Sequence, residues 1–452
     1  MASSTQDLTI GSPPKQIIRF AIPLLLGNLF QQFYNVIDTM IIGRSCGDLG
    51  LASIGAATPL NYLLNNLTIG VTLGFSVVIA KYFGAREYSE QRKAEAASIV
   101  WGVIIAVVMS AIAAVCAKPF FTFTKTPEDI IQGAYDYIYV IISLQMIPFL
   151  YNLEAAFLRA VGNSRVPVYA LIAGLVFNTI FDYIFVVRFG MDLKGAAIAT
   201  VLAQLISALI CFVYIWKKCE ALHLSRPDFG FTRARVIELM TMGFSTAVTL
   251  SVVEVGTIVL QSAINSFGSV VISSHTASRR LLSLATVPLN SMGSAAATFT
   301  GQNYGAKKPD RILAGIKSAL TFSFFWSLLA NLIFWPFGGQ LIGFLTGTQN
   351  QEIIQTSVYY LRFHFPLLFV LSVLFVFRQS LQGLTDKRTP VISSALEMIC
   401  KVVITYLLVP VIGYLGVCVA EPSIWVICMI FLVMKFFANP FIKEHTKNLK
   451  HT

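Results

Sequence analysis

The sequence predicts an all-α polytopic membrane protein with twelve transmembrane helices in two parallel six-helix repeats. Three observations predict this fold: the composition, the length of the apolar runs and an internal repeat. Of the 452 residues, 56% are hydrophobic and only 12% are charged, and the mean hydropathy is +0.72. A soluble chain has about 25% charged residues. This chain has too few to cover a surface in water, and the same figures exclude a disordered chain.

Twelve apolar segments are long enough to cross a bilayer, which takes about 20 residues. We expect helices, because backbone groups in lipid need hydrogen-bond partners inside the segment and these runs are too long for barrel strands. The predicted spans are residues 17–43, 51–81, 94–117, 130–160, 167–188, 193–216, 236–266, 270–302, 312–338, 352–383, 390–412 and 414–438.

Positive charge predicts the orientation of the spans. Most of the 33 lysines and arginines lie in the terminal tails and in every second loop, for example Arg92 and Lys93 in one loop and Lys217 and Lys218 in another. The positive-inside bias places both termini in the cytoplasm, which requires an even number of spans. We therefore expect a multi-pass protein of the cell (plasma or inner) membrane. The net charge of +11 is assigned to this bias and not to nucleic-acid binding.

The two halves of the chain resemble each other. Phe83-Gly84-Ala85-Arg86 is similar to Tyr304-Gly305-Ala306-Lys307, and three glycine pairs, 84/305, 162/383 and 195/416, share one spacing of 221 residues. Each half holds six spans, so the halves have the same orientation, are related by an axis along the membrane normal and leave a cleft between them. The predicted parts are an N-terminal lobe (1–216), a cytoplasmic linker (217–235), a C-terminal lobe (236–440) and a cytoplasmic tail (441–452).

Several catalytic motifs are absent. The sequence has no GxxxxGK[ST], HExxH or GxSxG, which disfavours an ATP motor and the common membrane hydrolases. Seven cysteines show neither CxxC nor metal-ligand spacing. We therefore expect no enzyme, no cofactor and no disulfide framework.

Four polar residues in predicted spans of the N-terminal lobe form the candidate site: Asp38, Asn178, Asp182 and Thr200. A carboxylate near the bilayer centre costs roughly 2.5–3.5 kcal/mol, so it usually has a partner or a task. Asn178 precedes Asp182 by four residues and shares its helix face. Counting about 1.5 Å per residue places all four in the outer half of the membrane. Their oxygens suit Na⁺ as ligands or H⁺ as relays.

The repeat favours a functional role for these acids over a purely structural one. At the spacing of 221, Asp38 corresponds to Val259, and Asp182 corresponds to the stretch near Val403. An acid needed only to hold helices together would more often recur in both halves. Glu254, in span 7, is a possible second coupling or substrate acid.

Other charges in the spans have less certain roles. Glu397 and Lys401 are four residues apart and are expected to neutralise each other. The three arginines within spans 8 and 10 either face a cavity or pair with acids, and the sequence does not decide between these: they are Arg279, Arg280 and Arg378. Glu421, which precedes Pro422, is a weaker candidate for a second site.

These residues resemble the multidrug and toxin extrusion (MATE) family over essentially the whole chain. The resemblance rests on Gln31–Met40, on the paired glycine loops, on Ala160–Ser164, on Asn178 with Asp182, and on Leu193–Thr200. It implies a V-shaped pair of lobes and efflux of organic, often cationic, compounds in exchange for H⁺ or Na⁺ by alternating access. It also implies a cation site at Asp38, Asn178, Asp182 and Thr200, with Glu254 used in some branches. Residues 360–383 hold no acid, which departs from members with an acid in span 10.

Other functions remain open from the residues alone. A flippase for a lipid-linked precursor has a similar architecture and needs a large cationic cavity, for which Arg279, Arg280 and Arg378 are available. A channel, a receptor and an intramembrane enzyme are less favoured. The expected partners are small organic substrates and the lipid bilayer, and one chain contains a complete cleft, so we expect a functional monomer.

Overall fold

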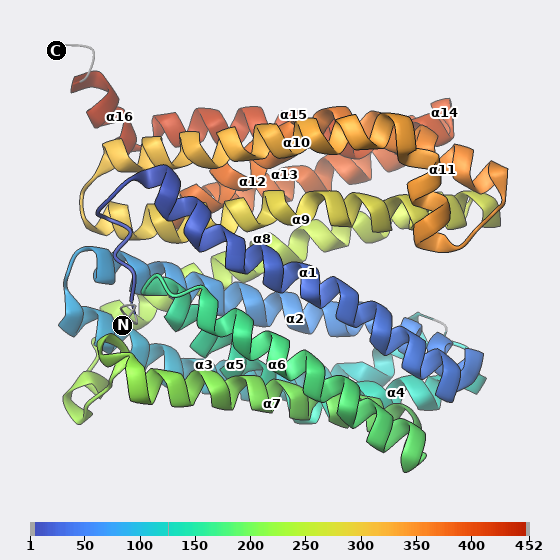
Figure 1. The fold of residues 1–452 in the computed structure, drawn as a ribbon, viewed down its shortest axis with the longest axis horizontal. Coiled ribbons are helices and arrows are strands. Elements are labelled where there is room, and N and C mark those ends of the chain that lie inside the picture. The colour runs from blue at the N-terminus through green and yellow to red at the C-terminus, as the bar shows by residue number, and fades with distance from the viewer. Residues whose placement is uncertain (1–4, 125, 449–452) are drawn as a thin grey trace. The chain divides into compact units, whose positions relative to one another are not determined.

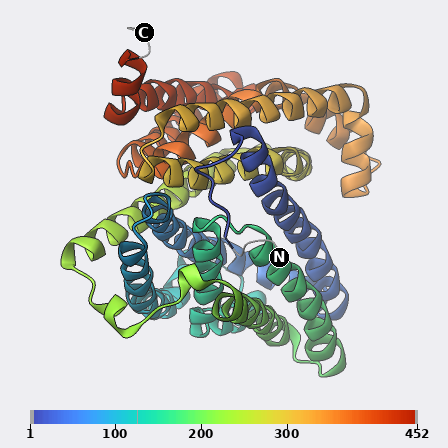
Figure 2. The same ribbon diagram turned by 60° about the vertical axis from the view of Figure 1, so that its left-hand side comes forward.

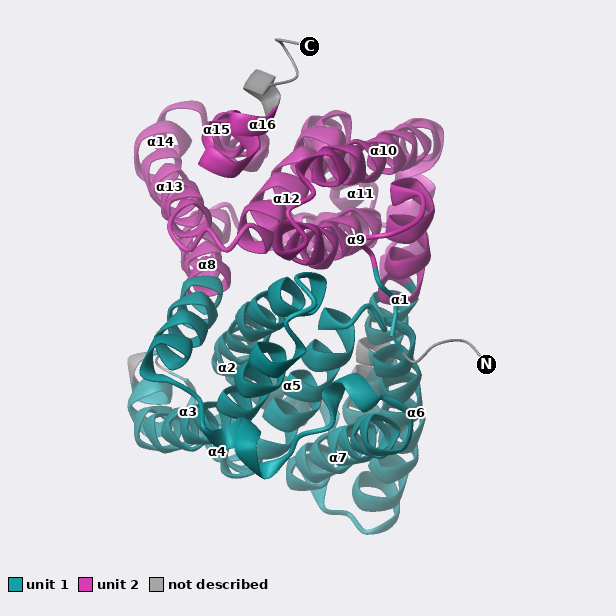
Figure 3. Cartoon of the chain, turned by 90° about the vertical axis from the view of Figure 1, so that its left-hand side faces the viewer, with its two compact units in different colours: residues 1–7, 26–247 teal, residues 8–25, 248–452 magenta. Residues whose placement is uncertain are grey.

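The computed structural model describes residues 5–124 and 126–448, and those residues form helices, turns and loops only (Figures 1 and 2). The chain divides into two compact units (Figure 3). Unit 1 comprises Met1–Asp7 and Leu26–Ala247, and unit 2 comprises Leu8–Leu25 and Val248–Thr452. The predicted all-α class is confirmed.

Each predicted span coincides with a helix or with a helix that is interrupted along its length. The helices of the first repeat are α1 (Pro13–Ser45), α2 (Gly47–Gly84), α3 (Tyr88–Phe123), α4 (Glu128–Ser143), α5 (Met146–Ala160), α6 (Arg165–Asp182) with the π-helical η1 (Tyr183–Arg188), and α7 (Asp192–Lys218). Those of the second repeat are α8 (Arg233–Asn265), α9 (Ser269–Gly305), α10 (Pro309–Thr346), α11 (Gln351–His364), α12 (Leu368–Gly383), α13 (Thr389–Val403) with the π-helical η5 (Ile404–Leu408) and α14 (Val409–Ile412), and α15 (Tyr414–Ala438). A short helix, α16 (Pro440–Asn448), follows.

Length and hydropathy identify most of these helices as membrane spans. Among the described residues, nine helices are long and apolar enough to cross a bilayer, and the bent pair α4 and α5 makes a tenth. The pair is bent by 51° at the break between Ser143 and Met146, where the sequence predicted one continuous span. Helices α1 and α9 fall outside this group, and α9 contains a polar stretch from Ser273 to Arg280.

The two repeats share local backbone geometry at matching positions. After α2, the Arg86 N–H donates to the Phe83 carbonyl at 3.0 Å, and after α9, the Lys307 N–H donates to the Tyr304 carbonyl at 3.0 Å. Arg86 and Lys307 both adopt positive φ, 61° and 55°, a conformation that few non-glycine residues adopt. The π-helical segments η1 and η5 also begin 221 residues apart. The sequence repeat is therefore also a structural repeat.

In unit 1, α2 packs against α3, α4 and α5, and α6 packs along α7. The first half of α8 approaches α2 closely at small residues. A Cβ atom on Gly70 would lie 2.3 Å from the Ala247 Cα, and one on Gly74 would lie 2.5 Å from the Met242 carbonyl oxygen. This is the small-xxx-small arrangement that lets membrane helices come into backbone contact.

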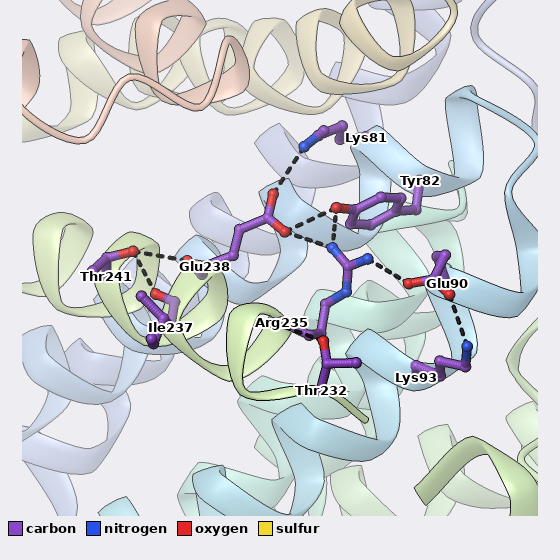
Figure 4. A network of polar contacts seen from close by, with 9 residues as sticks. All are labelled: Lys81, Tyr82, Glu90, Lys93, Thr232, Arg235, Ile237, Glu238 and Thr241. Atoms are coloured by element: carbon purple, nitrogen blue, oxygen red, sulfur yellow. Dashed lines mark hydrogen bonds and ion pairs between the residues drawn. The ribbon is translucent and has the colours of Figure 1, made fainter. Parts of the chain in front are cut away.

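Charged residues hold the start of α8 to the junction of α2 and α3 (Figure 4). Glu238 accepts hydrogen bonds from Lys81 Nζ and from the Tyr82 hydroxyl, each at 2.8 Å. The Arg235 guanidinium contacts Tyr82, Glu238 and, from the start of α3, Glu90. The start of α8, the first helix of the second repeat, is thus attached by hydrogen bonds and ion pairs to helices of the first repeat, and it belongs to unit 1.

The segment before α8 is attached to α3 in the same way. Its 3-10 turn Arg226–Phe229 is closed by a capping box, in which Ser225 N and Oγ donate to Asp228 Oδ2 at 2.8 and 2.7 Å. Arg92 Nε lies 3.3 Å from Asp228 Oδ1. Burial alone would raise the pKa of Asp228, but the hydrogen bonds from Ser225 and the Arg92 charge outweigh it and lower the pKa.

Unit 2 is built around α9 and α12, which pack on each other, on α10 and, from α12, on α15. It also includes residues near the N-terminus. The Leu8 N–H donates to Gln302 Oε1 at 2.9 Å, and the Arg311 guanidinium donates to the carbonyls of Leu8, Ile10 and Gly11 at 2.7–3.1 Å. The turn between α9 and α10 therefore holds the segment that precedes α1.

Candidate functional site

Asp38 and Asp182 face each other inside unit 1. Asp38 is carried by α1, and Asp182 is the last residue of α6, where the helix widens into the π-helical turn η1. Their carboxylates lie close enough to interact electrostatically. Because two carboxylates have only acceptors, a bridge between them needs a proton or a cation.

The polar atoms around this pair have no donor among the described residues. Asp182 is fully buried and Asn178 is 1% exposed. Both carboxylate oxygens of Asp182, Oδ1 of Asp38 and both polar atoms of the Asn178 amide have no hydrogen-bond partner in the described part of the chain. Buried polar groups are normally satisfied, so each such atom calls for an explanation. The cluster therefore offers carboxylate and amide oxygens as possible ligands for a cation.

Two tyrosines that the sequence analysis did not assign complete the surroundings. Tyr34, one turn before Asp38 on α1, interacts with both acids and forms a hydrogen bond with Thr200. Tyr137 of α4, 7% exposed, also lies close enough to interact with both acids. The spacing of four residues could have identified Tyr34. Tyr137 is far away in the sequence, and no sequence signal marks it.

Thr200 is joined to the acids through Tyr34. Its hydroxyl donates to the Ala196 carbonyl at 3.0 Å, and its side chain lies next to Tyr34. The four predicted residues therefore all belong to unit 1, and the two acids lie close enough to interact electrostatically. Glu254 belongs to unit 2, is exposed, and has Arg279 as a charged neighbour.

The two buried acids of unit 2, Glu397 and Glu421, are in a different situation, because each is paired with cations. Glu421 of α15 accepts two hydrogen bonds from Arg279 Nη1, both at 3.0 Å, and one from the Tyr360 hydroxyl at 3.3 Å. Lys401 Nζ lies 3.8 Å from Oε1 of Glu421. Glu421 is 5% exposed, so this pairing compensates a nearly complete loss of hydration.

The network continues from Glu421 to a second acid. Lys401 Nζ lies 3.3 Å from Glu397 Oε1, which confirms the neutralisation predicted from their spacing. Arg378 Nη2 donates to Glu397 Oε2 at 2.9 Å and to Ser393 Oγ at 3.0 Å, so this arginine pairs with an acid. Lys401 also donates to Thr257 Oγ1 at 3.0 Å. Among the described residues, Glu397 and Glu421 thus have cationic partners, whereas Asp38 and Asp182 have none.

No group of three or more His, Cys, Asp or Glu side chains with metal-binding geometry occurs in the described residues. A hard monovalent cation needs only oxygen ligands, and the cluster of Asp38, Asn178 and Asp182 has carboxylate and amide oxygens for one. The donor set therefore fits Na⁺ or H⁺ and does not resemble a transition-metal centre.

Comparison with known proteins identifies relatives of the whole chain. The MatE family model matches residues 23–184 and again 245–407, once in each repeat. The probable multidrug resistance protein YoeA of Bacillus subtilis is 25% identical over 357 residues, which cover 77% of each chain. The multidrug export protein MepA of Staphylococcus saprophyticus is 20% identical over 403 residues, which cover 89% of each chain.

Solved structures have the same fold. An outward-facing multidrug resistance MATE family transporter of the MOP superfamily aligns with a TM-score of 0.90 at 22% identity, covering 97% of this chain and 98% of that one. A MOP superfamily transporter from Pyrococcus furiosus aligns with the same score, identity and coverage. The predicted two-repeat architecture is confirmed by these matches together with the double match of the family model.

Proposed function

The chain belongs to the MatE family, and from this premise we propose that it is a secondary active antiporter that exports organic, often cationic, compounds in exchange for H⁺ or Na⁺. The main support is the interaction between the half-buried Asp38 and the fully buried Asp182, both of which have unsatisfied carboxylate oxygens. The names of YoeA and MepA, a probable multidrug resistance protein and a multidrug export protein, support the choice of substrate class.

The coupling step follows from the electrostatics of that pair. With no cation bound, two negative charges repel each other in a region of low dielectric constant, where the repulsion is much stronger than in water. A proton or Na⁺ that enters between them removes the repulsion and satisfies the free oxygens of Asp182 and Asn178. The site is therefore more compact when it is occupied.

Occupancy can then change the preference of the protein between two conformations. A ligand shifts such an equilibrium only by its differential affinity for the two states. Asp38 lies on α1, and residues 13–25 of this helix belong to unit 2 while residues 26–45 belong to unit 1. A change at Asp38 therefore acts on a helix shared by both units, as alternating access requires. We propose that both termini are cytoplasmic and that one chain is the functional species.

Transport into liposomes tests this proposal. Purified protein is reconstituted with a fluorescent cationic dye, and a proton gradient and a sodium gradient are imposed separately. Dye movement driven by one of them, and lost in Asp38→Asn, is the expected result. Asp129→Asn is the matched control, because Asp129 is an exposed acid in the first turn of α4.

The outcomes separate the antiporter from the flippase that the sequence left open. Normal gradient-driven movement in a well-folded Asp38→Asn variant contradicts the coupling role. Movement of a fluorescent lipid analogue across the bilayer, without gradient-driven dye movement, favours the flippase.

A further inference from the structure

Arg279 of α9 holds an ion pair and still presents much of its side chain to solvent. Its Nη1 makes both hydrogen bonds to Glu421, and Nε and Nη2 have no partner among the described residues. The side chain is 43% exposed, whereas that of Glu421 is 6% exposed. The free edge of a guanidinium carries two parallel N–H groups, which match the two oxygens of a carboxylate or phosphate.

The depth of Arg279 excludes an environment of lipid tails for this exposed edge. It lies ten residues after the start of α9, or about 15 Å along the helix. The residues that pair with Arg279 or with its partner lie at similar distances from the ends of their own helices. Glu421 is seven residues into α15, or about 10 Å, and Lys401 is eleven residues before the end of α14, or about 16 Å. A charged group at hydrocarbon depth faces a water-filled cavity or the bundle interior, because exposure to lipid is too costly.

The charges of this cluster do not cancel. Arg279, Lys401 and Arg378 contribute three positive charges against two negative charges from Glu397 and Glu421. One positive charge is therefore left in excess.

The charged residues next to the cluster do not change its excess of one positive charge. Arg280, which follows Arg279, is also exposed and has no acid partner among the described residues, while Glu254 is the exposed acid near Arg279. Adding both leaves one excess positive charge, which an anionic group would neutralise.

Buried neighbours hold Arg279 in place for such a ligand. Glu421 is fixed by the Tyr360 hydroxyl and by Lys401, and Tyr360 is fully buried. The Tyr360 ring stacks on His364 with centroids 4.0 Å apart. The guanidinium is therefore positioned from one side, and its other side is available without rearrangement, which lowers the cost of binding.

From this geometry we propose that the exposed edge of Arg279, with Arg280 beside it, binds the carboxylate or phosphate group of an amphiphilic ligand in unit 2. This proposal rests on the proposed transport function only in its assumption that the ligand is a compound that the protein transports. The site is separate from Asp38 and Asp182, so one compound and one coupling cation can bind to the same chain.

Binding in detergent, without any ion gradient, tests the proposal. The probe is dansylglycine, which carries an aromatic body and a carboxylate, and its control is the neutral amide dansylglycinamide. The wild-type protein is expected to bind the carboxylate at least tenfold more tightly than the amide, with an affinity that falls as salt is added.

Two variants locate the binding site. Arg280→Gln removes an exposed charge, and the double variant Arg279→Gln/Glu421→Gln removes the ion pair while leaving two amides able to hydrogen-bond each other. Both are expected to weaken dansylglycine binding tenfold or more and to leave dansylglycinamide unchanged. Lys317→Gln is the matched control, because Lys317 is an exposed cation of α10 with no ion pair among the described residues.

Competition distinguishes the two sources of such an anion. If phosphatidylglycerol in mixed micelles displaces dansylglycine, the site accepts a lipid headgroup; if a soluble phosphate monoester alone displaces it, the ligand is water-soluble. Equal binding of acid and amide by the wild type, or undiminished acid binding by both variants, overturns the proposal. Because no gradient is applied, that failure is distinct from a failure of coupled dye transport.

Discussion

Arg279 and Glu421 form an ion pair through a single nitrogen of the arginine, with both hydrogen bonds at 3.0 Å, and only the acid of this pair is buried. Among the described residues, no arginine or lysine pairs with Asp38 or Asp182 of unit 1. Asp38 and Asp182 therefore differ from Glu397 and Glu421 in their partners, and loss of charge is expected to have opposite effects on stability at Asp182 and at Glu421.

Loss of Glu421 should destabilise the protein. Glu421→Gln leaves the exposed Arg279 and the buried Lys401 with too little negative charge. Removing one partner of a fully buried pair costs about 3–5 kcal/mol, and the exposure of Arg279 reduces this figure here. We expect a lower melting temperature in detergent and partial recovery in Arg279→Gln/Glu421→Gln. Glu254→Gln, at an exposed acid, should change the melting temperature little. Equal melting temperatures for Glu421→Gln and the wild type would refute the role of this ion pair.

Asp182→Asn should have the opposite effect on the stability of the protein. The amide removes a buried charge that has no partner and can donate a hydrogen bond to Asp38. Relief of such strain at functional sites commonly adds about 0.5–2 kcal/mol of stability at the cost of activity. We expect an unchanged or higher melting temperature together with loss of gradient-driven dye transport. A strongly destabilised variant would instead indicate that Asp182 holds the helices together.

Gly70→Ala should disturb the contact between α2 and α8. Its Cβ would lie 2.3 Å from the backbone of Ala247, so the helices must separate, and overpacking of this kind costs about 1–3 kcal/mol. Gly55→Ala, on the same helix with no atom within 4 Å of the new Cβ, is the control and should be neutral or slightly stabilising. Melting temperatures of the two variants in one detergent make the comparison.

The segment before α8 should loosen only in acid. Hydrogen bonds and the Arg92 charge lower the pKa of Asp228 below its unfolded value of about 3.9. A lowered pKa gives stability that is present above the unfolded value and lost as the pH falls through the folded value. Hydrogen exchange of residues 219–232, corrected for intrinsic rates, should therefore be flat from pH 7 to 5 and rise below pH 4. Asp228→Asn should exchange faster at every pH and lose this dependence; an identical profile in the variant would contradict the role of Asp228.

Hydropathy was sufficient to predict the helices, because in lipid each apolar span must form the hydrogen bonds of its own backbone N–H and C=O groups, and an α-helix does so. The last predicted span, 414–438, has the same bounds as α15. The break between α4 and α5 was missed, since the residues from Ser143 to Met146 remain apolar enough to continue a span and contain no glycine or proline.

Side-chain pairing was predictable only where it follows helix periodicity. Glu397 and Lys401 are one turn apart, and their contact was expected from that spacing. The contacts of Arg378 with Glu397 and of Arg279 with Glu421 join different helices, 19 and 142 residues apart in sequence. Nothing in the sequence selects one acid over another for these arginines. Tyr137 is likewise placed beside Asp182 by tertiary packing alone.

The hydrogen bond between Leu8 and Gln302 spans 294 residues. On a ribosome that adds about 5–20 residues per second, the amide of Leu8 is made roughly 15–60 s before its acceptor exists. Residues 8–25 are therefore synthesised well before the residues of unit 2 that they contact. Deletion of residues 8–25 should thus impair assembly of unit 2, and the two halves expressed as separate polypeptides should assemble only if that segment is supplied.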